Sequence, residues 1–185
     1  MLDAFGLHGD PRWIPALTKA IRDVRAGPGR GFAWRRLSAV SLGRIGSPEA
    51  AKVVAQALTT EAREFEGKPG AGLGIQYPVR SLLLWALGEI GAVQAAPTIA
   101  DYLGNTSGTA MGGFYLPAMG ALLKFPASAC QATLTERLRT GGDVEAAHAL
   151  SILATLQGRH VAAAHSEDPR EPVQTVANAF LAEGD

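Results

Sequence analysis

Residues 80–103, RSLLLWALGEIGAVQAAPTIADYL, repeat the pattern of residues 35–58, RRLSAVSLGRIGSPEAAKVVAQAL. The two stretches align without a gap at a shift of 45 positions, and ten of the 24 aligned positions are identical. A fixed period of this length is typical of proteins that are built from repeated structural units. We therefore expect the chain to contain at least two copies of one such unit.

The spacing of apolar residues in each unit predicts two amphipathic helices that meet at a glycine. The apolar residues of the second unit fall on one broad face of each helix: Leu82, Trp85, Leu87 and Ile90 on the first, and Ala96, Ile99, Ala100 and Leu103 on the second. Gly46 and Gly91 stand where a helix C-cap needs a left-handed residue. Ser47 and Pro48 are typical of a helix start, with serine as the N-cap and proline at the first helical position.

The two units resemble the HEAT-like repeats that are named after phycocyanobilin lyases, whose pattern is V-R-x-x-A-x-x-A-L-G-x-I-G followed by a second helix. The matching residues are Val79 and Arg80 with residues 86–91, and Arg35 with residues 42–46. The resemblance implies a HEAT-repeat fold. It implies much less about function, because these repeats serve many unrelated proteins.

The rest of the chain predicts weaker copies of the unit. The fold class that we expect is all-α, a right-handed α-solenoid of about four HEAT-like helical hairpins with capping helices, in which each repeat contacts only its neighbours. We expect one domain over residues 1–185, with a capping helix at 11–26, repeats at 33–65, 78–104, 114–140 and 143–165, and a second capping helix at 171–182.

A glycine-rich segment precedes each of the first three repeats, at the same point of the unit. The segments are residues 26–32, 67–77 and 104–115. The second is not a phosphate-binding loop of the Walker A type, because Pro69 follows Gly67 and Lys68 where serine or threonine is required. Equivalent loops of a solenoid lie along one edge, so the three segments are expected to form a row there.

Two interpretations of these segments stay open. In the first, the row of loops binds a partner, as long insertions in repeats often do. In the second, the glycines only relax the turns between repeats, while Phe32, Tyr77 and Phe114 pack into the core at the start of the following helix.

Composition favours a protein with a sizeable core and no membrane partner. Hydrophobic residues make up 47% of the chain, and the formal charges cancel. Residues 82–100 carry only Glu89 as a charge, but the break at Gly91 leaves neither helix long enough to cross a bilayer. The single Cys130 cannot form an internal disulfide, and no signal peptide opens the chain, so we expect a cytoplasmic setting.

No catalytic, cofactor or metal site is expected from the sequence. Histidines and acids gather late in the chain, at His148, His160, His165, Glu167 and Asp168, but His160 and His165 are spaced poorly for two ligands on one helix face. No His-Glu dipeptide is present, whereas deoxyhypusine hydroxylases, which are HEAT-repeat enzymes, hold iron with such pairs. Cys130 lies among alanines, which favours a packed thiol over a nucleophile.

The first functional expectation is a non-enzymatic module or scaffold that binds another protein. It would bind through the concave face of the second helices and through the glycine-rich edge. The residues that we expect to contact the partner are Arg30, Lys52, Gln56, Lys68, Gly72, Asp101 and Asn105.

Two alternatives stay open. The resemblance to lyase repeats implies an accessory or catalytic subunit that acts on a tetrapyrrole-bearing protein. The second alternative is nucleic-acid binding, since residues 1–60 hold nine Lys/Arg and four Asp/Glu. The candidate basic ridge consists of Arg12, Lys19, Arg22, Arg25, Arg30, Arg35 and Arg36, although Arg35 and Arg80, at matching repeat positions, are expected to bond within or between repeats.

Overall fold

The protein is all-α in the computed structural model, which describes residues 9–23, 30–65, 76–105 and 113–183. Within those ranges the chain forms helices and turns and no strand. The elements in order are η1 (Pro11–Trp13), α2 (Ile14–Arg22), α3 (Arg30–Ile45), α4 (Pro48–Phe65), α5 (Gln76–Ile90), η2 (Val93–Ala95), α6 (Ala96–Ala100), α7 (Tyr115–Leu122), α8 (Ala127–Thr140), α9 (Asp143–Gln157), α10 (Arg159–Ala163) and α11 (Glu171–Ala182). This confirms the predicted fold class at the level of an all-α protein.

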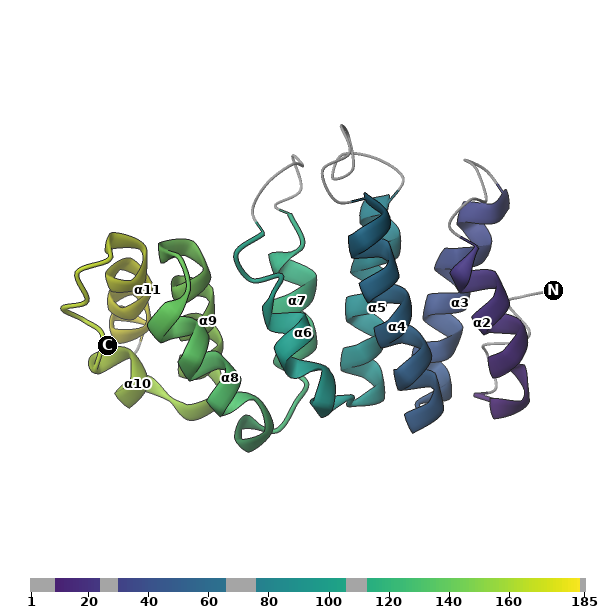
Figure 1. Cartoon of the computed structure of the whole chain (residues 1–185). Helices are drawn as coiled ribbons and strands as arrows, with labels where there is room; N and C mark the ends of the chain where they lie inside the picture. The colour runs from purple at the N-terminus through teal and green to yellow at the C-terminus, as the bar shows by residue number, and fades with distance from the viewer. Residues whose placement is uncertain (1–8, 24–29, 66–75, 106–112, 184–185) are drawn as a thin grey trace.

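The helices stand side by side in a row, in chain order, from α2 at one end to α11 at the other (Figure 1). Helix α5 packs between α3 and α7, and α9 packs against α11. We call α3, α5, α7, α9 and α11 the first-helix layer. The second-helix layer consists of α2, α4, α6, α8 and α10, of which α4 packs on α5, α6 on α7 and α8 on α9.

The helix breaks lie where the repeat predicts them. Gly46 and Gly91 have φ angles of 68° and 70°, in the left-handed region that favours glycine. At the start of α4 the hydroxyl of Ser47 accepts a hydrogen bond of 3.1 Å from the amide of Ala50, and Pro48 is the first helical residue. The capping signals of the first unit are therefore confirmed.

The second helix of the second unit is shorter than its counterpart α4. It consists of the 3₁₀ turn η2 and the five residues of α6. Its start lacks the Ser-Pro pair, because Ala92 and Val93 take the equivalent positions, and neither offers a side-chain cap. After Ala100 the amides of Tyr102 and Leu103 bond three residues back, so the helix tightens and ends.

The ends of the other helices lie close to the predicted ones. The N-terminal helix expected at 11–26 is η1 followed by α2, which ends at Arg22, and residues 24–29 lie outside the described part. Helix α3 begins at Arg30, three residues before the expected 33. The C-terminal helix α11 occupies the expected range of 171–182.

Small residues let the first helices approach one another closely, around a core of leucine, isoleucine and alanine from both layers. A Cβ atom on Gly43 would lie 3.1 Å from the Cα of Ala86, and one on Gly88 would lie 2.8 Å from the Cα of Ala121. Because these neighbours are backbone atoms, they cannot move aside as a flexible side chain could. The glycine in each A-L-G or S-L-G motif is therefore required by helix packing.

Gly88→Ala is expected to lower the free energy of unfolding by about 1 kcal/mol, because an overpacking cost of about 1–3 kcal/mol exceeds the roughly 1 kcal/mol that alanine gains in a helix. Gly120→Ala is the matched control on α7, since a Cβ there meets nothing within 4 Å. It should raise stability by up to about 1 kcal/mol. Urea unfolding measures both, and equal gains from the two substitutions would contradict the close approach.

Candidate interaction surfaces

The structure describes four of the seven predicted contact residues fully. Lys52 and Gln56 are exposed, one helical turn apart on α4, and Asp101 is exposed directly after α6. Asn105 is half-buried at the end of the turn that follows. Of the other three, Arg30 is the first residue of α3, but its side chain lies outside the described part, as do Lys68 and Gly72 with most of the glycine-rich segments.

Polar side chains bridge neighbouring helices of the second-helix layer. Arg22 of α2 donates a hydrogen bond to the side-chain oxygen of Gln56 on α4. Asp101 pairs with Arg137 of α8, whose other terminal nitrogen lies 3.2 Å from Glu145 Oε1. We call the surface that carries Lys52, Gln56, Asp101 and Arg137 the second-helix face. These bridges were not expected from the sequence.

Asn105 and Phe114 close the ends of the third glycine-rich segment. The amide of Phe114 donates a hydrogen bond of 3.2 Å to the carbonyl oxygen of Asn105. The Phe114 ring is buried, meets Tyr102 edge-on at 5.9 Å between centroids, and has the Arg80 guanidinium 5.2 Å from its centroid. The predicted core role of Phe114 is confirmed, whereas the side chains of Phe32 and Tyr77 lie outside the described residues.

A buried ionic cluster joins the four helices α2, α3, α4 and α5. The Arg35 guanidinium pairs with the carboxylate of Glu61 on α4 and donates a 3.1 Å hydrogen bond to the carbonyl of Ile21 on α2. Arg80, at the matching repeat position, donates to the backbone carbonyl of Glu61 at 2.9 Å. The expectation that the repeat arginines bond between helices is thus confirmed.

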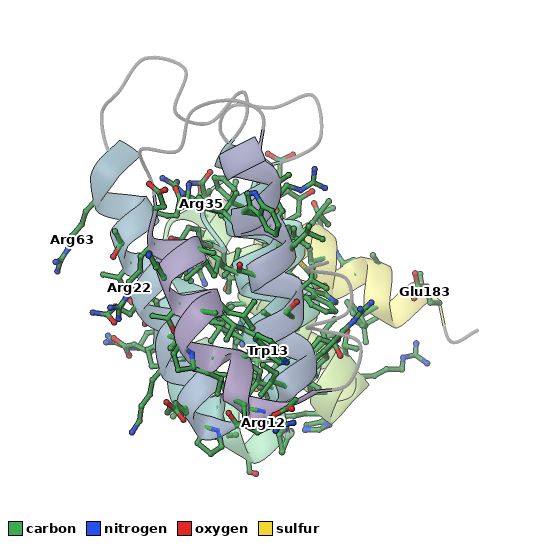
Figure 2. All side chains as sticks on the ribbon, turned by 90° about the vertical axis from the view of Figure 1, so that its right-hand side faces the viewer. Arg12, Trp13, Arg22, Arg35, Arg63 and Glu183 are labelled. Atoms are coloured by element: carbon green, nitrogen blue, oxygen red, sulfur yellow. The ribbon has the colours of Figure 1, made fainter. Side chains whose placement is uncertain are left out.

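The cluster removes Arg35 from the basic ridge. Only 4% of Arg35 is exposed, and it lies between α3 and α4 when the row is viewed from its N-terminal end (Figure 2). Arg22 and Arg63 project on the α4 side of that view, and Arg12 is bound to Asp10 by a 2.9 Å hydrogen bond from Nε. Arg35 therefore does not belong to an exposed basic ridge, and the side chains of Arg25 and Arg30 lie outside the described residues.

Three of the late histidines and acids, His148, His165 and Asp168, form structural contacts. His148 stacks on Tyr115 with 4.1 Å between ring centroids, and its Nδ1 lies 2.7 Å from the carbonyl oxygen of Leu103. His165 Nδ1 lies 3.4 Å from Asp168. In the ranges that the structure describes, three or more His, Cys, Asp or Glu residues nowhere gather closely enough to hold a metal ion.

Asp168 and Arg170 fasten the segment before α11 to α8. Arg170 donates two hydrogen bonds of 2.9 Å to the Asp168 carboxylate and one of 2.7 Å to the carbonyl of Leu138. These bonds from Arg170 hold the pKa of Asp168 well below its ordinary value of 3.8. Since the pKa is lowered on folding, this carboxylate stabilises the fold above about pH 5, and the contribution is lost as pH falls through 3.8 and below.

Asp168→Asn is therefore expected to lower the free energy of unfolding at pH 7 by about 1.5–3 kcal/mol, the range for hydrogen bonds to charged groups. The difference from the native protein should shrink as pH is lowered from about 6 to 2. Urea unfolding across this pH range measures it. A difference that stays constant with pH would mean that the charge of Asp168 contributes nothing.

Cys130 is a packed thiol, as predicted. It is fully buried, its Sγ lies 3.7 Å from the carbonyl oxygens of Pro126 and Ala127, and burial raises the pKa of the thiol. A raised pKa keeps sulfur protonated, and the thiolate is the nucleophilic form. The thiol is thus unsuited to nucleophilic catalysis.

Two apolar grooves open on the outer side of the first-helix layer, which the sequence analysis missed. The groove between α3 and α5, of about 340 Å³, is lined by Ala33, Arg36, Leu37, Val40 and Leu82. The groove between α5 and α7, of about 330 Å³, is lined by Ser81, Leu82, Trp85, Pro117, Gly120, Ala121 and Lys124. We call this surface of α3, α5 and α7 the first-helix face.

The grooves show that α5 has two apolar sides, whereas the sequence analysis expected one. Leu87 is buried in the core, but Leu82 and Trp85 are half-buried and line the grooves. Helix α5 is apolar on two sides, because one side packs on the second-helix layer and the other forms groove walls. Its nearly uninterrupted apolar sequence, SLLLWALG at residues 81–88, was the signal for this arrangement.

Comparison with known proteins identifies one repeat. Residues 79–105 match the family model of the PBS lyase HEAT-like repeat, which confirms the predicted resemblance for the second unit. No curated protein matches the chain. Among the described helices, none is long and apolar enough to cross a membrane.

Proposed function

From the HEAT-like repeat at residues 79–105, we propose that the chain is a non-enzymatic module that binds another protein in the cytoplasm. In this proposal the row of helices is a right-handed α-solenoid of HEAT-like hairpins. The partner lies along the second-helix face and the edge that carries the glycine-rich segments. A single observation supports this most: the second-helix face runs along the row and carries exposed, charged side chains on several successive helices.

The polar bridges on this face suit a binding surface. Lys52 and Asp101 are exposed, and the Asp101–Arg137 pair is partly open to solvent. Exposed ion pairs of this kind contribute only about 0–1 kcal/mol to folding. A partner can therefore exchange its own charged groups for them at little cost to the fold, as charge complementarity at interfaces requires.

The proposal is tested by capture and reconstitution. The tagged protein is cross-linked in its source cells, the captured proteins are identified, and each is titrated into the pure chain. Lys52→Glu and Asp101→Lys should each weaken binding by about tenfold or more, since each reverses a charge in the contact. Glu183→Lys, an equal reversal at the far end of the row, is the control and should bind normally.

Two results would reject the proposal. One is unchanged affinity of the reconstituted complex in both charge-reversal variants, which would place the partner elsewhere. The other is steady turnover of a metabolite by the pure chain without any captured protein, which would make the chain an enzyme.

The name of the matching repeat favours one second candidate, a bilin-lyase-like accessory or catalytic subunit that acts on a tetrapyrrole-bearing protein. A lyase-like subunit would attach or carry the pigment, and either step changes the visible absorption of a bilin. Mixing the pure chain with bilin and apo-phycobiliprotein should then shift the absorption spectrum. An unchanged spectrum removes this candidate and leaves the binding module.

A further inference from the structure

Three exposed cations stand on α2 and α4, the first two helices of the second-helix layer. Arg22 belongs to α2, and Lys52 and Arg63 belong to α4. None of the three forms an ion pair with a residue of the described part of the chain. Figure 2 shows that Arg22 and Arg63 project to the same side of the molecule. We call the surface of Arg22, Lys52 and Arg63 the basic stripe.

The basic stripe follows one side of α4. Lys52, Gln56 and Arg63 are spaced i, i+4 and i+11, which puts them on one side of a helix. Arg22 lies at the level of Gln56, because its guanidinium donates a hydrogen bond to the Gln56 side chain. At about 1.5 Å per residue, the helix rises by roughly 17 Å from Lys52 to Arg63. The three positive charges are therefore spread along that length.

The charges on α8, further along the same layer, neutralise one another instead. Arg137 pairs with Asp101 and Glu145, and Arg139 pairs with Glu136. A partner that binds there must first replace a carboxylate of this chain. The cations of the basic stripe carry no such competitor, so their charge is free to attract an acidic partner.

Recognition at the basic stripe depends on charge rather than on apolar burial. Among the residues that the structure describes, the large apolar side chains that are exposed lie outside α2 and α4. Between Lys52 and Arg63 the stripe carries the exposed, neutral side chains of Gln56 and Thr59. The surface thus suits a polar chain that carries negative charges.

We propose that an acidic segment of the protein partner binds the basic stripe in an extended conformation. The inference rests on the proposed function and adds the chemistry of the partner. A run of Asp and Glu repels itself and stays extended. Because an extended chain rises about 3.3 Å per residue and points alternate side chains the same way, about five residues span the stripe with every second carboxylate toward it.

Two exposed acids beside the stripe favour a peptide over a nucleic acid. Asp23 directly follows Arg22, and Glu49 precedes Lys52 by about one helical turn. Their carboxylates repel the continuous negative charge of a phosphate backbone. A peptide can instead place a neutral or basic residue opposite each of them.

The probe is a synthetic peptide of about ten residues in which glutamate alternates with serine, long enough to span the stripe with residues to spare. A second peptide has glutamine in place of every glutamate. Both carry an uncharged dye, and fluorescence anisotropy at low salt measures their affinity. The glutamate peptide should bind at least about tenfold more tightly than the glutamine peptide. Its binding should be lost at about 1 M salt, where charges are screened beyond about 3 Å.

Charge reversals locate the binding site. Arg22→Glu and Arg63→Glu should each weaken binding of the glutamate peptide about tenfold. Arg44→Glu is the matched control, because Arg44 is an exposed arginine on α3, in the other layer. It should bind the peptide normally. All three positions are exposed, so the variants should keep the fold, which circular dichroism checks.

Three outcomes would overturn the inference. Equal binding of the two peptides, or of neither, excludes recognition of carboxylates. Single-stranded DNA of about ten nucleotides that binds more tightly than the glutamate peptide, and is weakened by the same variants, makes the stripe a nucleic-acid site. A captured partner that binds Arg22→Glu and Arg63→Glu normally, but Asp101→Lys weakly, rejects this inference and leaves the proposed function standing. If no captured protein binds the native chain, the proposed function itself fails.

Discussion

Glu61→Ala is expected to lower the free energy of unfolding by about 3–5 kcal/mol, the cost of removing one partner from a buried ion pair. Glu61 is fully buried and Arg35 is 4% exposed, so the substitution leaves a guanidinium without its counter-charge inside the protein. Helices α2, α3 and α4, which the Arg35 guanidinium joins through Ile21 and Glu61, should loosen together. Urea unfolding followed by circular dichroism measures the loss.

Two controls separate this charge effect from lost packing. Arg35→Met with Glu61→Leu removes both charges and keeps apolar volume, so the double variant should be more stable than Glu61→Ala alone. Glu136→Ala breaks the exposed pair with Arg139 and should leave the unfolding curve unchanged. If Glu61→Ala behaves like Glu136→Ala, the buried pair does not hold these helices.

Phe114→Ala is expected to cost about 3–5 kcal/mol, as for other large aromatic residues removed from a core. The ring fills space against Tyr102 and also receives the Arg80 guanidinium, so its removal leaves a cavity and exposes one face of a buried cation. Leu116→Ala, two residues later and 52% exposed, is the control and should cost little. Thermal melts compare the two.

Phe114→Leu refines this prediction, because it keeps an apolar side chain and loses only the ring contacts. It should destabilise less than Phe114→Ala. Equal melting temperatures for Phe114→Ala and Leu116→Ala would show that the aromatic at the start of α7 does not hold this helix in place.

Local signals predicted much of the fold because they act within one unit. The left-handed glycines at Gly46 and Gly91 and the Ser47–Pro48 start depend only on their own backbone, and the structure confirms all of them. The absent side-chain cap at Ala92 is a local feature of the start of η2. The second helix of this unit ends before residue 104, where the sequence analysis ends the second repeat.

Contacts between units were harder to predict. The sequence indicated that Arg35 and Arg80 bond inside the array, but Glu61, 26 positions after Arg35, carried no signal that it would receive both. The grooves were missed for a related reason. Leu82 and Trp85 are apolar, and their spacing puts them on one side of the helix. When a helix is apolar on two sides, however, periodicity cannot show which side is covered by other helices.

The candidate contact residues show the same difference between features of one helix and contacts between helices. Lys52 and Gln56 are exposed four positions apart on α4, so one helix is enough to put both on the same side. The bonds that Arg22 donates to Gln56 and Arg137 donates to Asp101 depend on how neighbouring helices stack, which no single helix encodes. Their part in binding stays a prediction.

The most direct test of a protein-binding module is a calorimetric titration of the captured partner into the pure chain. We predict saturable binding with a Kd in the micromolar range or tighter. The molar ratio of partner to chain should be one to one or another fixed ratio. Lys52→Glu and Asp101→Lys should weaken it about tenfold, and Glu183→Lys should not. Absence of heat and of binding for every captured protein, with the native chain folded, would contradict the account.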